Sequence, residues 1–184
     1  MPNWSHSRIV ITLPSHEVVE NQAQRQTLWE IWRDLKYHLI ENRDESGNTD
    51  KLQPFNILRP RPADEEDNWY QWNSSHWGTK WDLRDLSFEI EEHDIELRGS
   101  TAWGPPIALL DYLHEIGFEI DADHISIENQ NWGYTEDGDT IAHELHRDWF
   151  DEEDEEDDIA TLLFDYECQN GIMSGRRLVN YIAW

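Results

Sequence analysis

The sequence lacks most of what would place it in a common class of enzyme or nucleic-acid-binding protein. Its 184 residues include one cysteine, Cys168, so no disulfide can form within the chain. Only 14 residues are Lys or Arg, against 40 Asp and Glu, and the formal net charge is −26. Because each phosphate contact needs a cation, this balance argues against direct binding of nucleic acid or of an anionic membrane.

Long apolar runs are also missing. No stretch approaches the roughly 18 residues that a membrane-spanning helix needs. The first residues, Met1-Pro-Asn-Trp-Ser-His, are too polar for a secretory signal. We therefore expect a cytoplasmic protein, and we treat the glycosylation-like triplet at Asn73 as chance.

Motifs that carry chemistry are absent or incomplete. The sequence has no glycine-rich phosphate loop, nucleophile elbow or Cys/His pair. His143 and His146 do not form an HExxH motif, and on the strand expected there they would face opposite sides. The stretch 136–139 lacks the rest of a calcium loop and is typical of a hairpin turn. We expect no metal, no cofactor and no enzymatic activity.

Aromatic residues, by contrast, are abundant. The chain has 11 Trp, which can build a core from few large side chains. The stretch 86–106 contains two alternating apolar/polar runs around a short polar turn, and its last two prolines can open a helix. The run 8–13 predicts a buried strand, and three- and four-residue spacing predicts a helix over 15–41.

The order of these elements predicts the fold. A second helix is expected from 107 to Gly117, and a fourth strand over 118–120 or, more strongly, 125–129. Strand, helix, strand, strand, helix, strand is the α+β, ferredoxin-like split βαβ arrangement, with both helices on one face of an antiparallel sheet. We expect this domain to span 1–130.

Two further segments complete the expected organisation. A Trp-rich insertion, 42–84, separates the first helix from the second strand, with a short extended piece at 54–58 and a short helix over 64–73. Residues 131–184 would form an acidic extension packed on the same domain, with a strand over 141–149 and a further helix.

Three separated motifs resemble those of the Api-ninety-two-like family of ferredoxin-like domains. They are Met1-Pro2-Asn3-Trp4, Trp77-Gly78-Thr79-Lys80-Trp81-Asp82 and Thr101-Ala102-Trp103-Gly104-Pro105-Pro106. The resemblance covers roughly 1–130 and implies a phage- or plasmid-borne protein in the cytoplasm of a host cell. Ser5 stands where this family commonly has Cys, so the resemblance implies no role for a thiol there.

The first functional hypothesis rests on the acidic residues. An interaction protein from a mobile element could imitate nucleic-acid phosphate, and so bind and inhibit a basic host protein in defence or nucleic-acid processing. The expected contact residues are Asp148 and the run Asp151, Glu152, Glu153, Asp154, Glu155, Glu156, Asp157 and Asp158. A second acidic band consists of Glu89, Glu91, Glu92, Asp94 and Glu96.

An alternative hypothesis is a small-ligand or peptide-binding module. Its pocket would be formed by Trp77, Gly78, Trp81 and Trp103, with Lys80 as the cation for an anionic ligand. A Trp-rich segment can equally be a lid packed on the core. The acidity would then reflect only solubility or adaptation to salt. The sequence leaves these alternatives open.

Overall fold

The structure is a computed structural model. It describes residues 3–15, 18–19, 21–42, 49, 52–126, 131–136 and 138–144. Nearly all of them belong to one compact unit, Met1–His143. Several sequence predictions lie outside the described residues: those for His146, Asp148, the acidic run Asp151–Asp158, Cys168 and the further helix.

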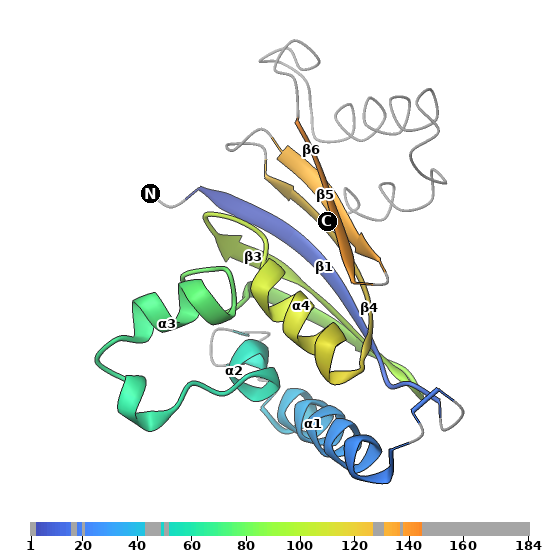
Figure 1. Ribbon diagram of the computed structural model, residues 1–184. Helices are drawn as coiled ribbons and strands as arrows, with labels where there is room; N and C mark the ends of the chain where they lie inside the picture. Colours follow the sequence, from blue (N-terminus) through green and yellow to red (C-terminus); the bar gives the residue numbers. More distant parts are fainter. Residues whose placement is uncertain are drawn as a thin grey trace, which may run out of the picture. The chain divides into compact units, whose positions relative to one another are not determined.

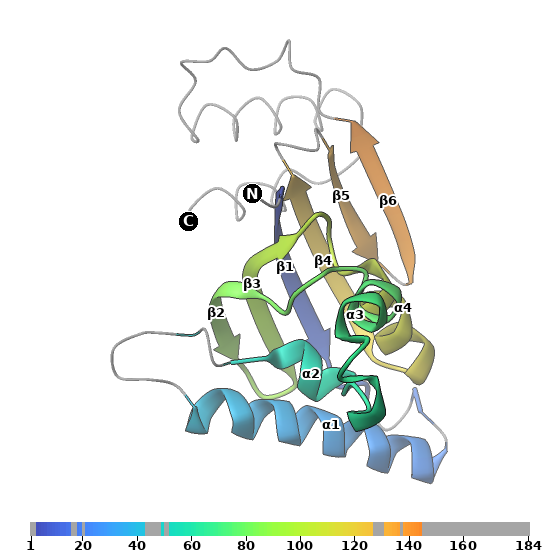
Figure 2. The same cartoon turned by 90° about the vertical axis from the view of Figure 1, so that its left-hand side faces the viewer.

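Six strands form one sheet in the order β2-β3-β1-β4-β5-β6 (Figures 1 and 2). Their bounds are Trp4–Thr12 for β1, Arg84–Ile90 for β2, Asp94–Ala102 for β3, Glu119–Ser126 for β4, Asn131–Glu136 for β5 and Asp139–Glu144 for β6. The pairs β1–β3, β1–β4, β2–β3 and β4–β5 are all antiparallel. The predicted α+β class is therefore confirmed.

The helices lie on one side of this sheet (Figure 1). They are α1 (Gln22–Glu41), α2 (Pro54–Leu58), α3 (Trp69–His76) and α4 (Ile107–Ile116), with a 3₁₀ turn at Ala63–Glu65. In the turned view, α1 runs across the strands rather than along them (Figure 2). Within the described ranges, no helix is long and apolar enough to cross a membrane.

Alternation along β1 divides the sheet into a covered and an open face. Ile9 and Ile11 are buried in the hydrophobic core, and their neighbours in register include Leu97, Ile95 and Ile120. Because successive side chains of a strand point to opposite faces, the residues between them face away from the helices. The core between sheet and helices also contains Leu35 and Leu39 of α1 and Leu109 and Leu113 of α4.

Four predicted elements differ from the observed ones. The first strand is Trp4–Thr12 rather than 8–13, and the helix predicted over 64–73 is a 3₁₀ turn at Ala63–Glu65 followed by α3, Trp69–His76. The first helix begins at Gln22 rather than near 15, because the side chain of Asn21 accepts the N–H groups of Ala23 and Gln24 and caps it. The piece at 54–58 is helical rather than extended. There the Asp82 carboxylate accepts the N–H groups of Phe55 and Asn56, a cap supplied from far along the chain.

The remaining elements follow the sequence patterns more closely. The second predicted helix is α4, which ends at Gly117 in the left-handed conformation with φ +114°. Of the described residues of the two alternative fourth strands, 119–120 and 125–126 belong to one strand, β4. The hairpin β5–β6 turns at Gly138, with φ +83°, and extends the sheet beyond β4. The predicted strand over 141–149 is described as far as 144.

Candidate functional site

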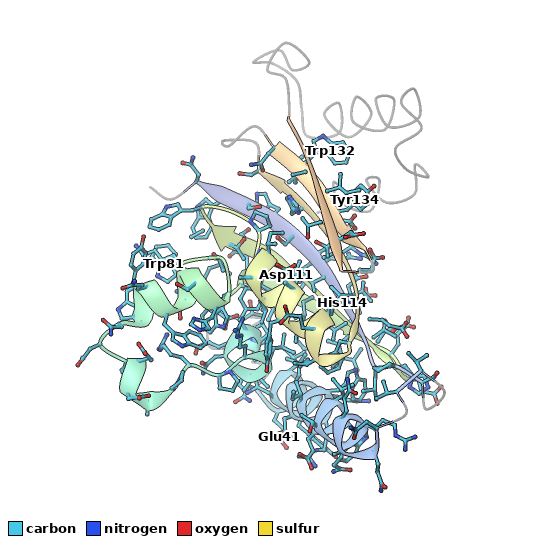
Figure 3. The ribbon with its side chains drawn as sticks, in the orientation of Figure 1. Glu41, Trp81, Asp111, His114, Trp132 and Tyr134 are labelled. Carbon is cyan, nitrogen blue, oxygen red and sulfur yellow. The ribbon has the colours of Figure 1, made fainter. Side chains whose placement is uncertain are left out.

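Aromatic side chains from four separate segments gather where β1 begins. We call this cluster, which consists of Trp4, Tyr70, Lys80, Trp81 and Trp103, the aromatic end. The Lys80 ammonium nitrogen lies 4.5 Å from the Trp81 ring, 5.0 Å from the Trp103 ring and 5.7 Å from the Tyr70 ring. The cation is thus surrounded by three ring faces that attract it. Figure 3 shows Trp81 beside α3.

The rings of the aromatic end also contact one another and remain open to solvent. Tyr70 and Trp103 meet edge to face at 5.7 Å, and Trp4 and Trp81 lie 6.2 Å apart. Trp103 is 47% exposed and Tyr70 44% exposed. Large apolar side chains clustered at a surface mark a contact site more often than single ones do.

Backbone strain is concentrated at the same place. Among the described residues other than glycine, only Asp85 and Trp103 have positive φ, at 50° and 75°. The Trp103 N–H donates to the Asn3 carbonyl at 2.7 Å, and β2 is irregular in register between Arg84 and Ser87. Strained backbone and bulges persist where the surrounding structure holds them, and they are enriched at functional sites.

Two clefts adjoin Trp81, and arginine side chains line both of them. One, of about 350 Å³, is lined by Trp4, Trp81, Arg84 and Asp85. The other, of about 310 Å³, shares Trp81 and Arg84 and adds Arg61, whose guanidinium donates to the Asn73 side chain and to Glu66. Sequence reasoning missed Arg61 and Arg84, because only the fold brings them to Trp81.

Asp82 fastens the Trp-rich insertion to the sheet. Its carboxylate accepts three backbone N–H groups, from Phe55 and Asn56 at 3.0 Å and from Leu83 at 2.9 Å. Burial raises the pKa of Asp82 to about 7, although these hydrogen bonds oppose the shift. The insertion is further tied to α4, since the Arg59 guanidinium donates to the Ala108 carbonyl and stacks on Tyr112.

The structure brings together three of the five residues predicted for the ligand pocket. Lys80, Trp81 and Trp103 meet. Trp77 lines the 310 Å³ cleft together with Trp81, but it is 3% exposed in the core and donates its ring N–H to the Arg59 carbonyl. Gly78 has φ +83° and approaches the start of α4 so closely that a Cβ would lie 3.1 Å from two backbone nitrogens. Trp77 and Gly78 therefore pack the insertion onto the fold.

Next to the aromatic end along β1, the face of the sheet that the helices cover is polar. Ser5 and Ser7 are buried on β1, and His124 is the β4 neighbour of Ser7 in register. The His124 ring lies against Gly133 of β5, where a Cβ would come within 2.9 Å of it. Burial lowers the pKa of His124 to about 4, so the imidazole is neutral at pH 7.

Carboxylates are concentrated on the open face of the sheet. The Arg8 guanidinium forms ion pairs with Glu96 at 2.8 Å, Asp123 at 3.3 Å and Asp121 at 3.9 Å. Burial works to lower the pKa of Arg8, but these three charges outweigh it and raise the pKa. Arg98 pairs with Glu96 as well. The two arginines thus offset part of the negative charge at the centre of the acidic face.

The predicted acidic band lies partly in this centre and partly outside it. Glu96 is mostly buried, and Asp94 accepts the Thr12 hydroxyl at 2.6 Å. Glu89, Glu91 and Glu92 are exposed on β2 and the turn after it. The acids of β4 were not predicted, because alternation within one strand does not show which strand will pair with β1.

Comparisons with known proteins give one structural neighbour. No family model and no curated protein matches the sequence. The structure is similar to the crystal structure of a protein api92 from Yersinia pseudotuberculosis, family model DUF1281, with a TM-score of 0.44 and 10% identity. The match covers 79% of this chain and 99% of that one. A likeness of this size carries no argument about fold or function, so the family resemblance stays a prediction.

Proposed function

We propose that this chain is a non-enzymatic binding protein, and that the aromatic end holds a planar anionic ligand. The observation that carries the proposal is the convergence of aromatic rings, cations and strained backbone around Trp81. A flat ring could stack along Trp4 and Trp81 in the 350 Å³ cleft, and its anionic group could meet Arg84 at the cleft wall. Clefts of about 300 Å³ or more are in the range used for small ligands.

Charge distribution supports an anion rather than a cation at this place. Lys80, Arg84 and Arg61 lie around Trp81 in a chain that has only 14 basic residues. Asp85 lines the cleft of Trp4, Trp81 and Arg84 as well, and its repulsion would orient the anion toward Arg84.

Calorimetric titration with 2-naphthoate and with the neutral 2-naphthalenemethanol tests the proposal. We expect the carboxylate to bind more tightly, and Arg84→Gln and Trp81→Leu each to weaken its binding about five- to tenfold. Arg33→Gln, which removes an exposed cation of α1, is the matched control and should leave binding unchanged. Equal binding of the two probes, or equal effects of both arginine changes, would refute the proposal.

A second candidate function is imitation of nucleic acid, by which the chain would bind and inhibit a basic host protein. The exposed carboxylates of Glu89, Glu91 and Glu92 support it, since they extend the acidic face at its edge. The test compares capture of basic nucleic-acid-binding proteins by the unchanged chain and by the triple Glu→Gln variant, at low and at high salt. Capture that is independent of salt and of these residues would count against imitation.

We propose further that residues through β4 form a ferredoxin-like core. The order β2-β3-β1-β4, with helical connections from β1 to β2 and from β3 to β4, supports this assignment. The three sequence motifs support an Api-ninety-two-like protein of a phage or plasmid, acting in the cytoplasm of its host. Localisation of a tagged chain after phage infection or plasmid transfer would test this origin and compartment.

A further inference from the structure

A larger cleft lies at the opposite end of β1, between α1 and the ends of three strands. Its volume is about 950 Å³, and its walls come from Leu13 after β1, from Leu28, Trp29 and Trp32 of α1, from the turn between β2 and β3, and from the start of β4. We call it the α1 cleft. It shares no residue with the aromatic end, so an inference about it does not depend on the proposed function.

The lining of the α1 cleft combines apolar side chains with two acids and with other polar side chains, among them Gln22, Gln26 and His93. Leu28 is 1% exposed and Trp32 7% exposed, whereas Trp29 is 45% exposed. Glu92, from the turn between β2 and β3, and Glu119, at the start of β4, are exposed lining residues. The described residues hold no group of three or more His, Cys, Asp or Glu side chains placed for a metal ion.

The rings of this cleft already attract cations. The Arg33 guanidinium lies 4.9 Å from the Trp29 ring, and the Lys36 ammonium lies 4.8 Å from the Trp32 ring. Both cations follow their ring by four residues on α1, which places each on the same side of the helix as its ring. Because like charges repel, a ligand cation would take the place of Arg33 on the exposed Trp29 ring, and Asp34, 2.6 Å from the Arg33 guanidinium, keeps a partner for the displaced arginine.

We propose that the α1 cleft binds a small organic cation with an apolar body. The body would lie against Leu28 and Trp32, and its ammonium or guanidinium group would meet the Trp29 ring between Glu92 and Glu119. The net charge of −26 would raise the concentration of such a cation near the surface. Two cations of the chain oppose binding: Arg25, which lines the cleft, and Arg33, which lies over the Trp29 ring.

Three probes with one aromatic body test the sign of the charge. We would titrate the full chain with phenethylammonium, 2-phenylethanol and 3-phenylpropionate at 0.15 M salt, where attraction to distant charges is screened. The proposal expects the cation to bind most tightly and the carboxylate least. Tightest binding by the carboxylate, equal binding of cation and alcohol, or no binding of any probe would overturn it.

Matched variants then locate the bound cation. Changing Glu92→Gln and Glu119→Gln together should weaken binding of phenethylammonium about five- to tenfold, as expected for the loss of two exposed ion pairs. Arg25→Gln should tighten it about twofold. Glu41→Gln removes one negative charge at the far end of α1 and should change nothing. An effect of Glu41→Gln of about half that of the double variant, or more, would overturn the site, because attraction would then follow net charge alone.

Discussion

The two ends of β1 differ in nearly every property that decides what a surface binds. At Trp4 the covered face is polar, the neighbouring backbone is strained, and Lys80 and Arg84 bring positive charge. At Thr12 the covered face is apolar, and the cleft beyond it is rimmed by Glu92 and Glu119. The comparison teaches that the net charge of this chain is a poor guide to its individual sites.

The acidic face between these ends makes the same point. Glu96, Asp121 and Asp123 lie on one face of the sheet, and all three surround Arg8. Arg8 offsets part of their charge, and Glu96 and Asp123 are mostly buried, so they contribute less to a docking surface than exposed acids do. This is why the geometry favours the aromatic end over imitation of nucleic acid.

Among the variants that test this comparison of the two ends, Asp82→Ala is expected to have the largest effect on stability. Alanine cannot accept hydrogen bonds from the N–H groups of Phe55, Asn56 and Leu83. All three part-buried N–H groups would lose their hydrogen bond to Asp82. We expect the free energy of unfolding to fall by about 3 kcal/mol in urea titrations. Asp64→Ala, an exposed acid in the 3₁₀ turn of the same insertion, should cost less than about 0.5 kcal/mol. Equal costs would mean that Asp82 does not anchor the insertion.

Arg8→Met should have the next largest effect on stability. It changes the acidic face of the sheet, between the two ends of β1. Methionine keeps the length of the side chain but removes the guanidinium that Glu96, Asp121 and Asp123 share, while Glu96 keeps its ion pair with Arg98. We expect a loss of about 2.5 kcal/mol in the free energy of unfolding. Adding Asp123→Asn should restore part of it, measured in the same titration. No recovery in the double variant would show that the loss comes from packing rather than charge.

A pH titration sharpens the difference between the polar and the apolar half of the covered face. The pKa of His124 is lowered to about 4 by burial, whereas the unfolded chain takes up this proton near pH 6.5. Between these values the unfolded state binds more protons, so stability falls as the pH falls. At pH 5 the expected loss is about 2 kcal/mol.

His124→Gln isolates this contribution from those of the many acids. The variant should show a flatter decline in the free energy of unfolding between pH 6.5 and pH 5 than the unchanged chain. His114→Gln, an exposed position on α4, serves as the control and should keep the original slope. Parallel curves for all three chains would contradict a neutral His124 in the folded state.

Sequence patterns predicted correctly those helices and strands that depend on neighbours within a few residues. The alternation in β2 and β3, the apolar spacing of α4 and its glycine cap all depend on neighbours within a few residues, and they were predicted from the sequence. α2 was mistaken for an extended piece because its N-terminal N–H groups are accepted by Asp82, 26 and 27 residues away. No pattern within 54–58 contains that information.

The candidate site at the aromatic end was also predicted only in part. The order Trp77-Gly78-Thr79-Lys80-Trp81 drew attention to the right segment, but spacing could not separate buried Trp77 from the partly exposed Trp81. Tyr70, Arg61 and Arg84 joined the site only through packing of α3 and β2 against the start of β1. The α1 cleft was not predicted at all, since its walls come from segments about 80 residues apart.

The smallest expected effect concerns the cations that lie over rings at both ends. Lys80 faces three rings, whereas Lys36 faces the ring of Trp32. If each ring face adds to the attraction, Lys80→Met should lower the free energy of unfolding by about 1 kcal/mol and Lys36→Met by about 0.5 kcal/mol. Combining Lys80→Met with Trp103→Leu should cost less than the sum of the single changes, because the pair interacts only when both are present. If the losses of stability are additive, the position of Lys80 is set by its own backbone rather than by attraction to the rings. The aromatic end would then accept a ligand cation as readily as an anion.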